Sequence, residues 1–126
     1  MSDFIAKFEV FSPRWGHPDT YNIIFKPDQM CITQGMFEAN CKQDDNADPV
    51  WDGYGCGDEN PLMAIFSNDS IFAPEIVPFL LERAWCKWKE GALEEAVLRE
   101  GLNDLFKWID QTGRSKPNSE LWEGIF

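Results

Sequence analysis

The chain has 126 residues and a formal net charge of −11, and 44% of its residues are hydrophobic and 14% aromatic. That length and composition suffice for one folded core, which excludes a globally disordered protein. The electrostatic field of so negative a chain repels phosphate backbones, which disfavours direct nucleic-acid binding.

The first residues lack the basic start and apolar run of a secretory signal, and no window approaches the ~20 apolar residues that span a bilayer. We therefore expect a soluble cytoplasmic protein without membrane contact. Cytoplasmic cysteines are usually free thiols. A disulfide between Cys41 and Cys56, which flank the acidic residues between them, is the alternative. The chain has one His and no C-x-x-C pair, which excludes a zinc site of the usual spacing.

Residues 1–40 have the pattern of a β-rich region. Phe4 to Phe11 alternates apolar and charged residues, as a half-buried strand does. Residues 12–19 contain Pro and Gly and predict a loop, whereas residues 21–25 and 30–33 predict two further strands, with Gly35 marking a bulge. We expect an antiparallel meander of three to five strands.

Residues 41–60 are expected to form a long acidic loop. Residues 44–75 hold eight acids and no Lys or Arg, a net charge of −8. An EF-hand is excluded because Pro49 and Gly55 stand where its turn glycine and its bidentate Glu belong. We expect no metal site and no cofactor.

The acidic loop also carries aromatic residues, which makes it a candidate binding surface. An aromatic face with carboxylates nearby suits a cationic group through ring-quadrupole attraction and charge pairing. A solvated loop without a function is the alternative that the sequence leaves open. The candidate ligand- or partner-binding residues of this loop are Asp44, Asp45, Asp48, Trp51, Asp52 and Tyr54.

Residues 74–113 have the period of helices, whereas Asn60 to Phe66 fits either a helix or a strand. The first helix is expected to have Pro78 in its first turn and to stop at Gly91. The second covers residues 93–112, with Gly113 as its cap. The apolar tail, residues 114–126, is expected to dock on the core or on a neighbouring subunit.

Strands followed by helices indicate an α+β fold in a single domain, residues 1–126, with two main helices on one face of the sheet. Trp85, Trp88 and Trp108 of these helices form either an aromatic pocket or ordinary core. Both readings stay open.

A second candidate site surrounds the only histidine, at Trp15, His17 and Asp19. A carboxylate beside His17 would orient it as a base or a ligand contact. No nucleophile motif accompanies it, and His-Pro-Asp also suits a turn. We assign no catalytic residue and lean against an enzyme.

The segments RWGHPDTYNIIFKPDQMCI and LFKWIDQTGRSKPNSELWEGIF, together with the acidic layout, resemble the small bacterial proteins carried on integron gene cassettes. The resemblance implies a bacterial cytoplasmic protein, often a homo-oligomer, with no assigned ligand.

Two functions follow as hypotheses. The first is a homodimeric or larger binding protein, immunity- or antitoxin-like or regulatory, that engages a basic protein or a cationic small molecule through the acidic loop. Its binding should be strongly salt-dependent. The alternative is a small-molecule-binding protein or enzyme with an aromatic pocket near the Trp15–Tyr21 loop.

Overall fold

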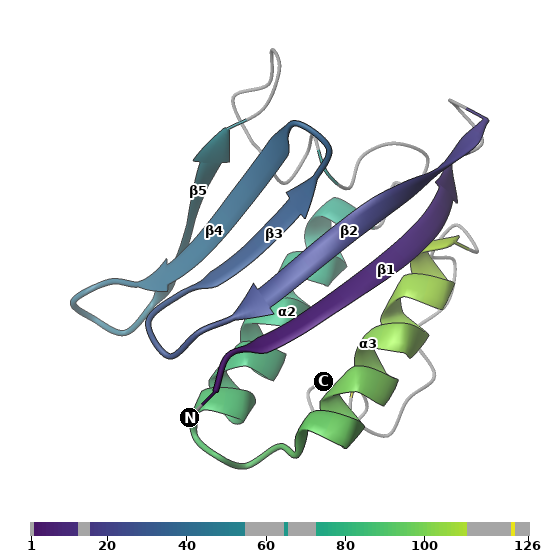
Figure 1. Ribbon diagram of the computed structural model, residues 1–126. Coiled ribbons are helices and arrows are strands. Elements are labelled where there is room, and N and C mark those ends of the chain that lie inside the picture. The colour runs from purple at the N-terminus through teal and green to yellow at the C-terminus, as the bar shows by residue number, and fades with distance from the viewer. Residues whose placement is uncertain (1, 13–15, 55–64, 66–72, 111–121, 123–126) are drawn as a thin grey trace.

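The structure, a computed structural model, describes residues 2–12, 16–54, 65, 73–110 and 122. Five strands precede two helices, which confirms the predicted α+β fold (Figure 1). The elements are β1 (Phe4–Ser12), β2 (His17–Phe25), β3 (Met30–Gln34), β4 (Phe37–Gln43), β5 (Pro49–Tyr54), α2 (Ala73–Lys89) and α3 (Glu95–Asp110).

The strands form one antiparallel sheet in the order β1-β2-β3-β4-β5, so each strand pairs with its neighbours in the chain. The five strands confirm the predicted meander. The predicted loop over residues 12–19 is wrong in part, because β2 already begins at His17. The pairing of β1 with β2 continues as far as Ser12, which lies opposite His17. Pro18 is tolerated there because it lies near the start of the strand.

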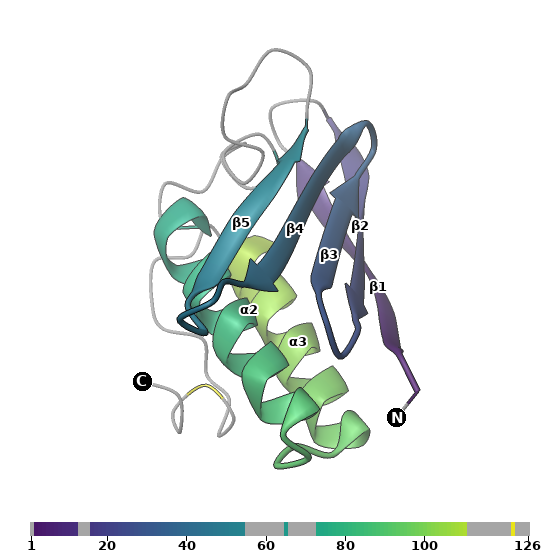
Figure 2. The ribbon, with the colours of Figure 1, turned by 90° about the vertical axis from the view of Figure 1, so that its left-hand side faces the viewer.

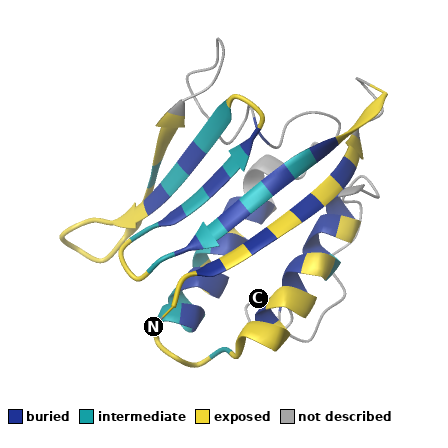
Figure 3. Ribbon diagram, in the orientation of Figure 1, coloured by how far each residue is buried: buried dark blue, intermediate teal, exposed yellow. Residues whose placement is uncertain are grey.

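The sheet has one buried face, against which both helices pack (Figure 2). Burial alternates along β2 and β3, as expected when one face meets a core and the other meets water (Figure 3). We call the helix-covered side the inner face. Its β1 residues are Phe4, Ala6, Phe8 and Val10.

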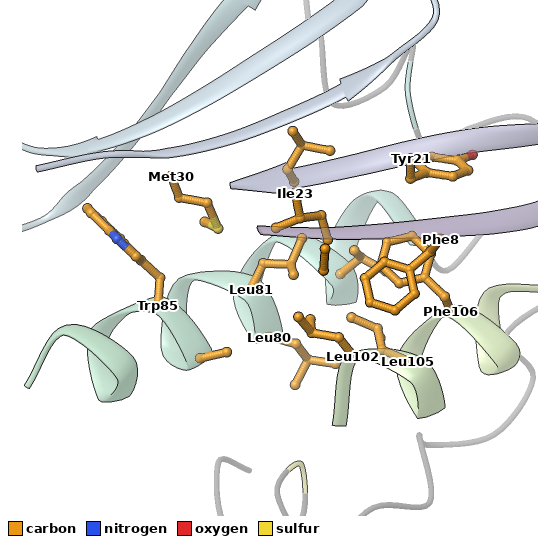
Figure 4. Packing of buried hydrophobic residues seen from close by; sticks show 14 of the residues in the cluster. Phe8, Tyr21, Ile23, Met30, Leu80, Leu81, Trp85, Leu102, Leu105 and Phe106 are labelled. Atoms are coloured by element: carbon orange, nitrogen blue, oxygen red, sulfur yellow. The ribbon is translucent and has the colours of Figure 1, made fainter. Parts of the chain in front are cut away.

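Aromatic rings join α3 to the first two strands. The Phe8 and Phe106 rings stack with centroids 4.6 Å apart, and Tyr21 meets Phe106 at 5.4 Å (Figure 4). Leu80 and Leu81 of α2 are fully buried in the same core. Each such side chain stabilises the fold by about 1.5–3 kcal/mol through removal of apolar area from water.

The end of α2 follows the prediction. Gly91 has φ +77, and its N–H donates to the Trp88 carbonyl while the Ala92 N–H donates to the Lys87 carbonyl. These two bonds are those of a Schellman motif, which satisfies carbonyls that the helix leaves free.

The predicted position of Pro78 in the first turn is wrong. α2 begins at Ala73, so Pro78 is its sixth residue and provides no N–H to the carbonyl four residues earlier. α3 runs from Glu95 rather than residue 93, and the predicted cap at Gly113 lies outside the described residues.

The predicted loop over residues 41–60 is also wrong in part. Residues 41–43 end β4 and residues 49–54 form β5, joined by a turn at 44–48. Cys41 lies on the inner face, paired with Met30 on one side and Trp51 on the other, and it is completely buried. Gly35 is not a bulge, since it lies in the two-residue turn between the paired Gln34 and Phe37.

Of the segment from Asn60 to Phe66, only Ile65 is described, and it is helical and buried. Trp122 is the described residue of the tail. It is fully buried, and its indole N–H donates to the Gly101 carbonyl at 2.6 Å. Among the described helices, none is long and apolar enough to cross a membrane.

Candidate functional site

Four of the eight acidic residues of segment 44–75 lie on a hairpin at one edge of the sheet, which we call the acidic hairpin, residues 43–54 (Figure 1). The Asp44 carboxylate accepts the backbone N–H groups of Asn46 and Asp48, each at 2.9 Å. Asp44 therefore shapes the turn with its side chain, as short acidic residues commonly do. Asp45 and Asp48 are exposed beside it.

Trp51 and Asp52 point to opposite faces of the sheet. Trp51 pairs with the buried Cys41 on the inner face, whereas the exposed Asp52 pairs with Asn40 on the outer face. The Trp51 indole N–H donates to the Glu82 carboxylate of α2 at 2.5 Å. Asp52 therefore lies on the opposite face of the sheet from Trp51, and the carboxylate that Trp51 contacts comes from a helix.

The residues missed by sequence reasoning are Glu82, Cys86 and Lys89, which recur at helical spacing along the α2 surface beneath the hairpin. The Lys89 ammonium donates to the Gln43 side-chain oxygen and also lies 3.9 Å from the centroid of the Trp85 ring. Their i, i+4, i+7 spacing, which places all three on one side of α2, was the available signal.

Burial sets the protonation of the groups under the hairpin. Desolvation raises the pKa of the Glu82 carboxyl, while the Trp51 hydrogen bond and Arg83 oppose that rise. Desolvation, assisted by the Glu82 charge, raises the pKa of Cys41 to about 12. Cys41 therefore stays protonated at neutral pH and is a poor nucleophile.

The thiol of Cys31, on the outer face, also has a raised pKa, because it is desolvated and lies beside Glu38. Cys31, Cys41 and Cys86 are free thiols, and Cys56 lies outside the described residues. Within the part of the chain that the structure describes, no three His, Cys, Asp or Glu side chains gather as a metal site would require.

The other predicted site lies at the opposite corner of the sheet, at the start of β2 (Figure 1). The Nδ1 atom of His17 is 3.3 Å from the Asp19 carboxylate; the His17 side chain is 60% exposed and that of Asp19 only 9%. Nearby on the inner face, the Tyr21 hydroxyl donates to the Ile65 carbonyl at 3.1 Å. The side-chain oxygen of Gln34, opposite Tyr21, is buried and accepts no hydrogen bond from the described residues.

The two predicted sites therefore do not form one pocket. β2 and β5 are separated by two strands, and His17 and the acidic turn lie at opposite ends of the sheet. Trp15 and the side chain of Tyr54 lie outside the described residues.

The tryptophans of the helices are part of the core. Trp85, Trp88 and Trp108 are buried, and the Trp85 indole N–H donates to the Lys26 carbonyl at 2.7 Å. Of the two readings of these side chains, the structure favours ordinary core.

The comparisons with known proteins agree with the resemblance in the sequence. Residues 4–113 match the model of the integron cassette protein family. A solved structure from the mobile metagenome of V. cholerae, integron cassette protein VCH_CASS3, superposes with a TM-score of 0.73 at 31% identity, covering 98% of this chain and 94% of that one. No match is found among the curated proteins. The chain therefore belongs to the integron cassette protein family.

Proposed function

We propose that this protein is a binding protein whose acidic hairpin engages a basic, extended segment of a partner protein. One observation carries the proposal: four carboxylates are exposed on a hairpin that contains no Lys or Arg and ends the sheet. They belong to Asp44, Asp45, Asp48 and Asp52. Such a concentration of one sign of charge attracts an oppositely charged partner and steers its approach.

The position of β5 supports an extended partner. β5 is the last strand in the sheet order, so no described strand pairs with its outer edge. Edge strands accept an added strand through backbone hydrogen bonds. Pro49 and the like charges of the hairpin oppose pairing with a second copy of the same edge, whereas a basic strand meets attraction.

Trp51 provides an apolar contact on this edge. Its ring is half-buried against the core, and its indole N–H is fixed by Glu82. A partner Lys or Arg stem could lie along the ring while its charged end reaches the Glu82 carboxylate. The buried thiol of Cys41 provides no nucleophile here, which favours binding over covalent catalysis.

The test compares two variants with the same change in net charge. In the hairpin variant, Asp45, Asp48 and Asp52 become Asn; in the control, Asp3 becomes Asn while Glu90 and Glu100 become Gln, all at exposed positions. Asp44 is left in place because it shapes the turn. The probe is a synthetic peptide of alternating Arg and Thr, titrated by calorimetry at about 0.05 M and about 0.5 M salt, where screening lengths differ severalfold.

We expect the peptide to bind more weakly at high salt, and the hairpin variant to lose about tenfold more affinity than the control, since each exposed charge pair contributes about 0.2–1 kcal/mol. Absence of binding, or equal losses in the two variants, would show that the hairpin is not the binding surface.

A further inference from the structure

The inner face of the sheet carries two polar residues at one end. Apart from aromatic and cysteine side chains, Asp19 of β2 and Gln34 of β3 are the buried polar residues in the part of the chain that the structure describes, and each is only 9% exposed. Burial alternates along both strands, so these positions share a face with the core residues Ile23 and Ile32. The fold therefore places a carboxyl and a carboxamide group where an apolar side chain would be more stable.

Asp19 and Gln34 are neighbours on that face. Gln34 lies directly opposite Tyr21, and Asp19 precedes Tyr21 by two residues on the same strand. Diagonal positions of this kind on one face of an antiparallel pair bring the Cβ atoms within about 8 Å of each other. A single small group between the two side chains can therefore contact both.

The two side chains offer acceptor oxygens with few donors around them. Oε1 of Gln34 is buried and accepts no hydrogen bond from the described residues. One carboxylate oxygen of Asp19 lies 3.3 Å from Nδ1 of His17, which also lies 3.2 Å from the Pro18 carbonyl oxygen. Because both of these neighbours are acceptors, Nδ1 carries the hydrogen. Within the described chain, His17 is the polar partner of the Asp19 carboxylate.

The surroundings of these acceptors are apolar. Asp19 lies opposite the buried Val10 of β1, and Gln34 lies opposite Phe37 of β4, which packs against the core. The Tyr21 hydroxyl donates its hydrogen to a backbone carbonyl, so it provides no donor to either side chain. In apolar surroundings an acceptor without a donor is costly, so a ligand that brings donors and positive charge is favoured there.

We propose that Asp19 and Gln34 form a binding site, here called the ammonium site, for a small molecule with a primary ammonium group on an apolar stem. An ammonium group has three N–H donors and one positive charge, so it can pair with the Asp19 carboxylate and donate to Oε1 of Gln34 at the same time. The apolar stem suits the side chains that flank the two acceptors. A metal ion fits less well, because the described residues bring no three metal-ligating side chains together here.

The test is calorimetric titration of the full chain with 2-phenylethylammonium chloride as the probe. 2-Phenylethanol and phenylacetate have nearly the same shape and report the contribution of the charge. We expect the ammonium compound to bind, the alcohol to bind at least about tenfold more weakly, and the carboxylate not to bind. If the ammonium compound at about 10 mM gives no binding heat, a buried water alone supplies the missing donor and the proposal is overturned.

Two variants each remove one partner of the ammonium group. Asp19→Asn keeps the shape of the side chain and removes its charge, whereas Gln34→Met keeps its length and removes the acceptor. Each should weaken binding of 2-phenylethylammonium by about tenfold or more, because hydrogen bonds that involve a charged group are the strong ones. Glu100→Gln, at an exposed position on α3, changes the net charge as Asp19→Asn does and should leave the affinity unchanged. Unchanged affinity in either site variant, or an equal loss in Glu100→Gln, would refute the site.

Thermal unfolding separates a binding role of Gln34 from a structural one. Without ligand, Gln34→Met should unfold at a higher temperature than the wild type, because it removes a buried acceptor that lacks a donor. A lower unfolding temperature would show that the fold itself satisfies this oxygen, which would overturn the proposal. Gln34→Met should still bind the peptide of alternating Arg and Thr, since the acidic hairpin is intact, so the two proposals can fail independently.

Discussion

Replacing Gly53 of β5 with Ala is expected to destabilise the fold by more than a substitution at an exposed position usually does. Gly53 has φ +156, which side chains of L residues rarely adopt. A Cβ atom there would lie 1.9 Å from the Glu38 carbonyl oxygen and 2.8 Å from the Ala39 Cα. Both are backbone atoms of β4, so no change of rotamer relieves the contact. Either the dihedral angle changes or β4 and β5 move apart.

The expected cost has two contributions. Holding a non-glycine residue in a disfavoured backbone region costs about 1–3 kcal/mol. Forcing extra atoms into occupied space costs about 1–3 kcal/mol more. Gly53→Ala should therefore lower the free energy of unfolding by about 2–6 kcal/mol, a large part of the about 5–15 kcal/mol typical of a folded domain.

Gly35→Ala is the matched control. Gly35 has φ +60 in the turn between β3 and β4, and a Cβ atom there would meet nothing within 4 Å. Its cost should therefore be the backbone contribution alone, about 1–2 kcal/mol. The difference between the two variants reports the steric contact with Glu38 together with any additional backbone cost at φ +156.

Urea unfolding followed by circular dichroism gives both free energies, and thermal unfolding should shift by about 4 °C per kcal/mol for a chain of this size. We expect Gly53→Ala to unfold at clearly lower urea than Gly35→Ala. If the two differ by less than about 0.5 kcal/mol, the β4–β5 contact does not impose the constraint described here.

Two further predictions concern hydrogen bonds between partly buried groups. Burial raises the pKa of Glu82 above its ordinary 4.5, so stability present below that value is lost as pH rises through the folded pKa. Glu82→Gln keeps an acceptor for the Trp51 indole but has no carboxyl group to titrate. In urea titrations, the free energy of unfolding of this variant should exceed that of the wild type by a margin that grows from pH about 4 to about 7. Parallel pH profiles of the two proteins would contradict this. Trp85→Phe leaves the Lys26 carbonyl without its donor and should cost about 1–3 kcal/mol in the same assay, beyond the loss of ring volume; a cost under about 1 kcal/mol would show that water replaces the indole.

The parts of the fold with a clear periodicity were predictable from the sequence. The alternation from Phe4 to Phe11 predicted β1, and the apolar stripes with Gly91 between them predicted the two helices. In these elements the face that is buried in the fold is the one that the local apolar pattern indicates, so the pattern is sufficient to predict the element.

β5 was missed because its own residues do not favour a strand. Its sequence from Pro49 to Tyr54 includes Pro, Asp and Gly, which are depleted in strands. The strand is held by the Trp51 bond to Glu82, which is remote in the sequence, and by its hairpin pairing with the buried Cys41. No local pattern encodes the contact with Glu82.

For the candidate site, the acids could be identified by composition alone. Their arrangement could not, because the period of two that places Trp51 and Asp52 on opposite faces applies only once the segment is known to be a strand. The partnership of His17 with Asp19 was predictable from their spacing, since both lie on one side of β2.

The stacking of Phe106 on Phe8 also bears on the order of folding. The sheet is assembled from hairpins between adjacent strands, which form early because little chain entropy is lost in closing them. The inner side of β1, however, is covered by a helix that follows it by almost the length of the chain, and that helix is held in turn by Trp122. During synthesis, the inner-face aromatic side chains of β1 therefore stay exposed until α3 has been synthesised. Chaperone engagement and aggregation should be greatest in that interval.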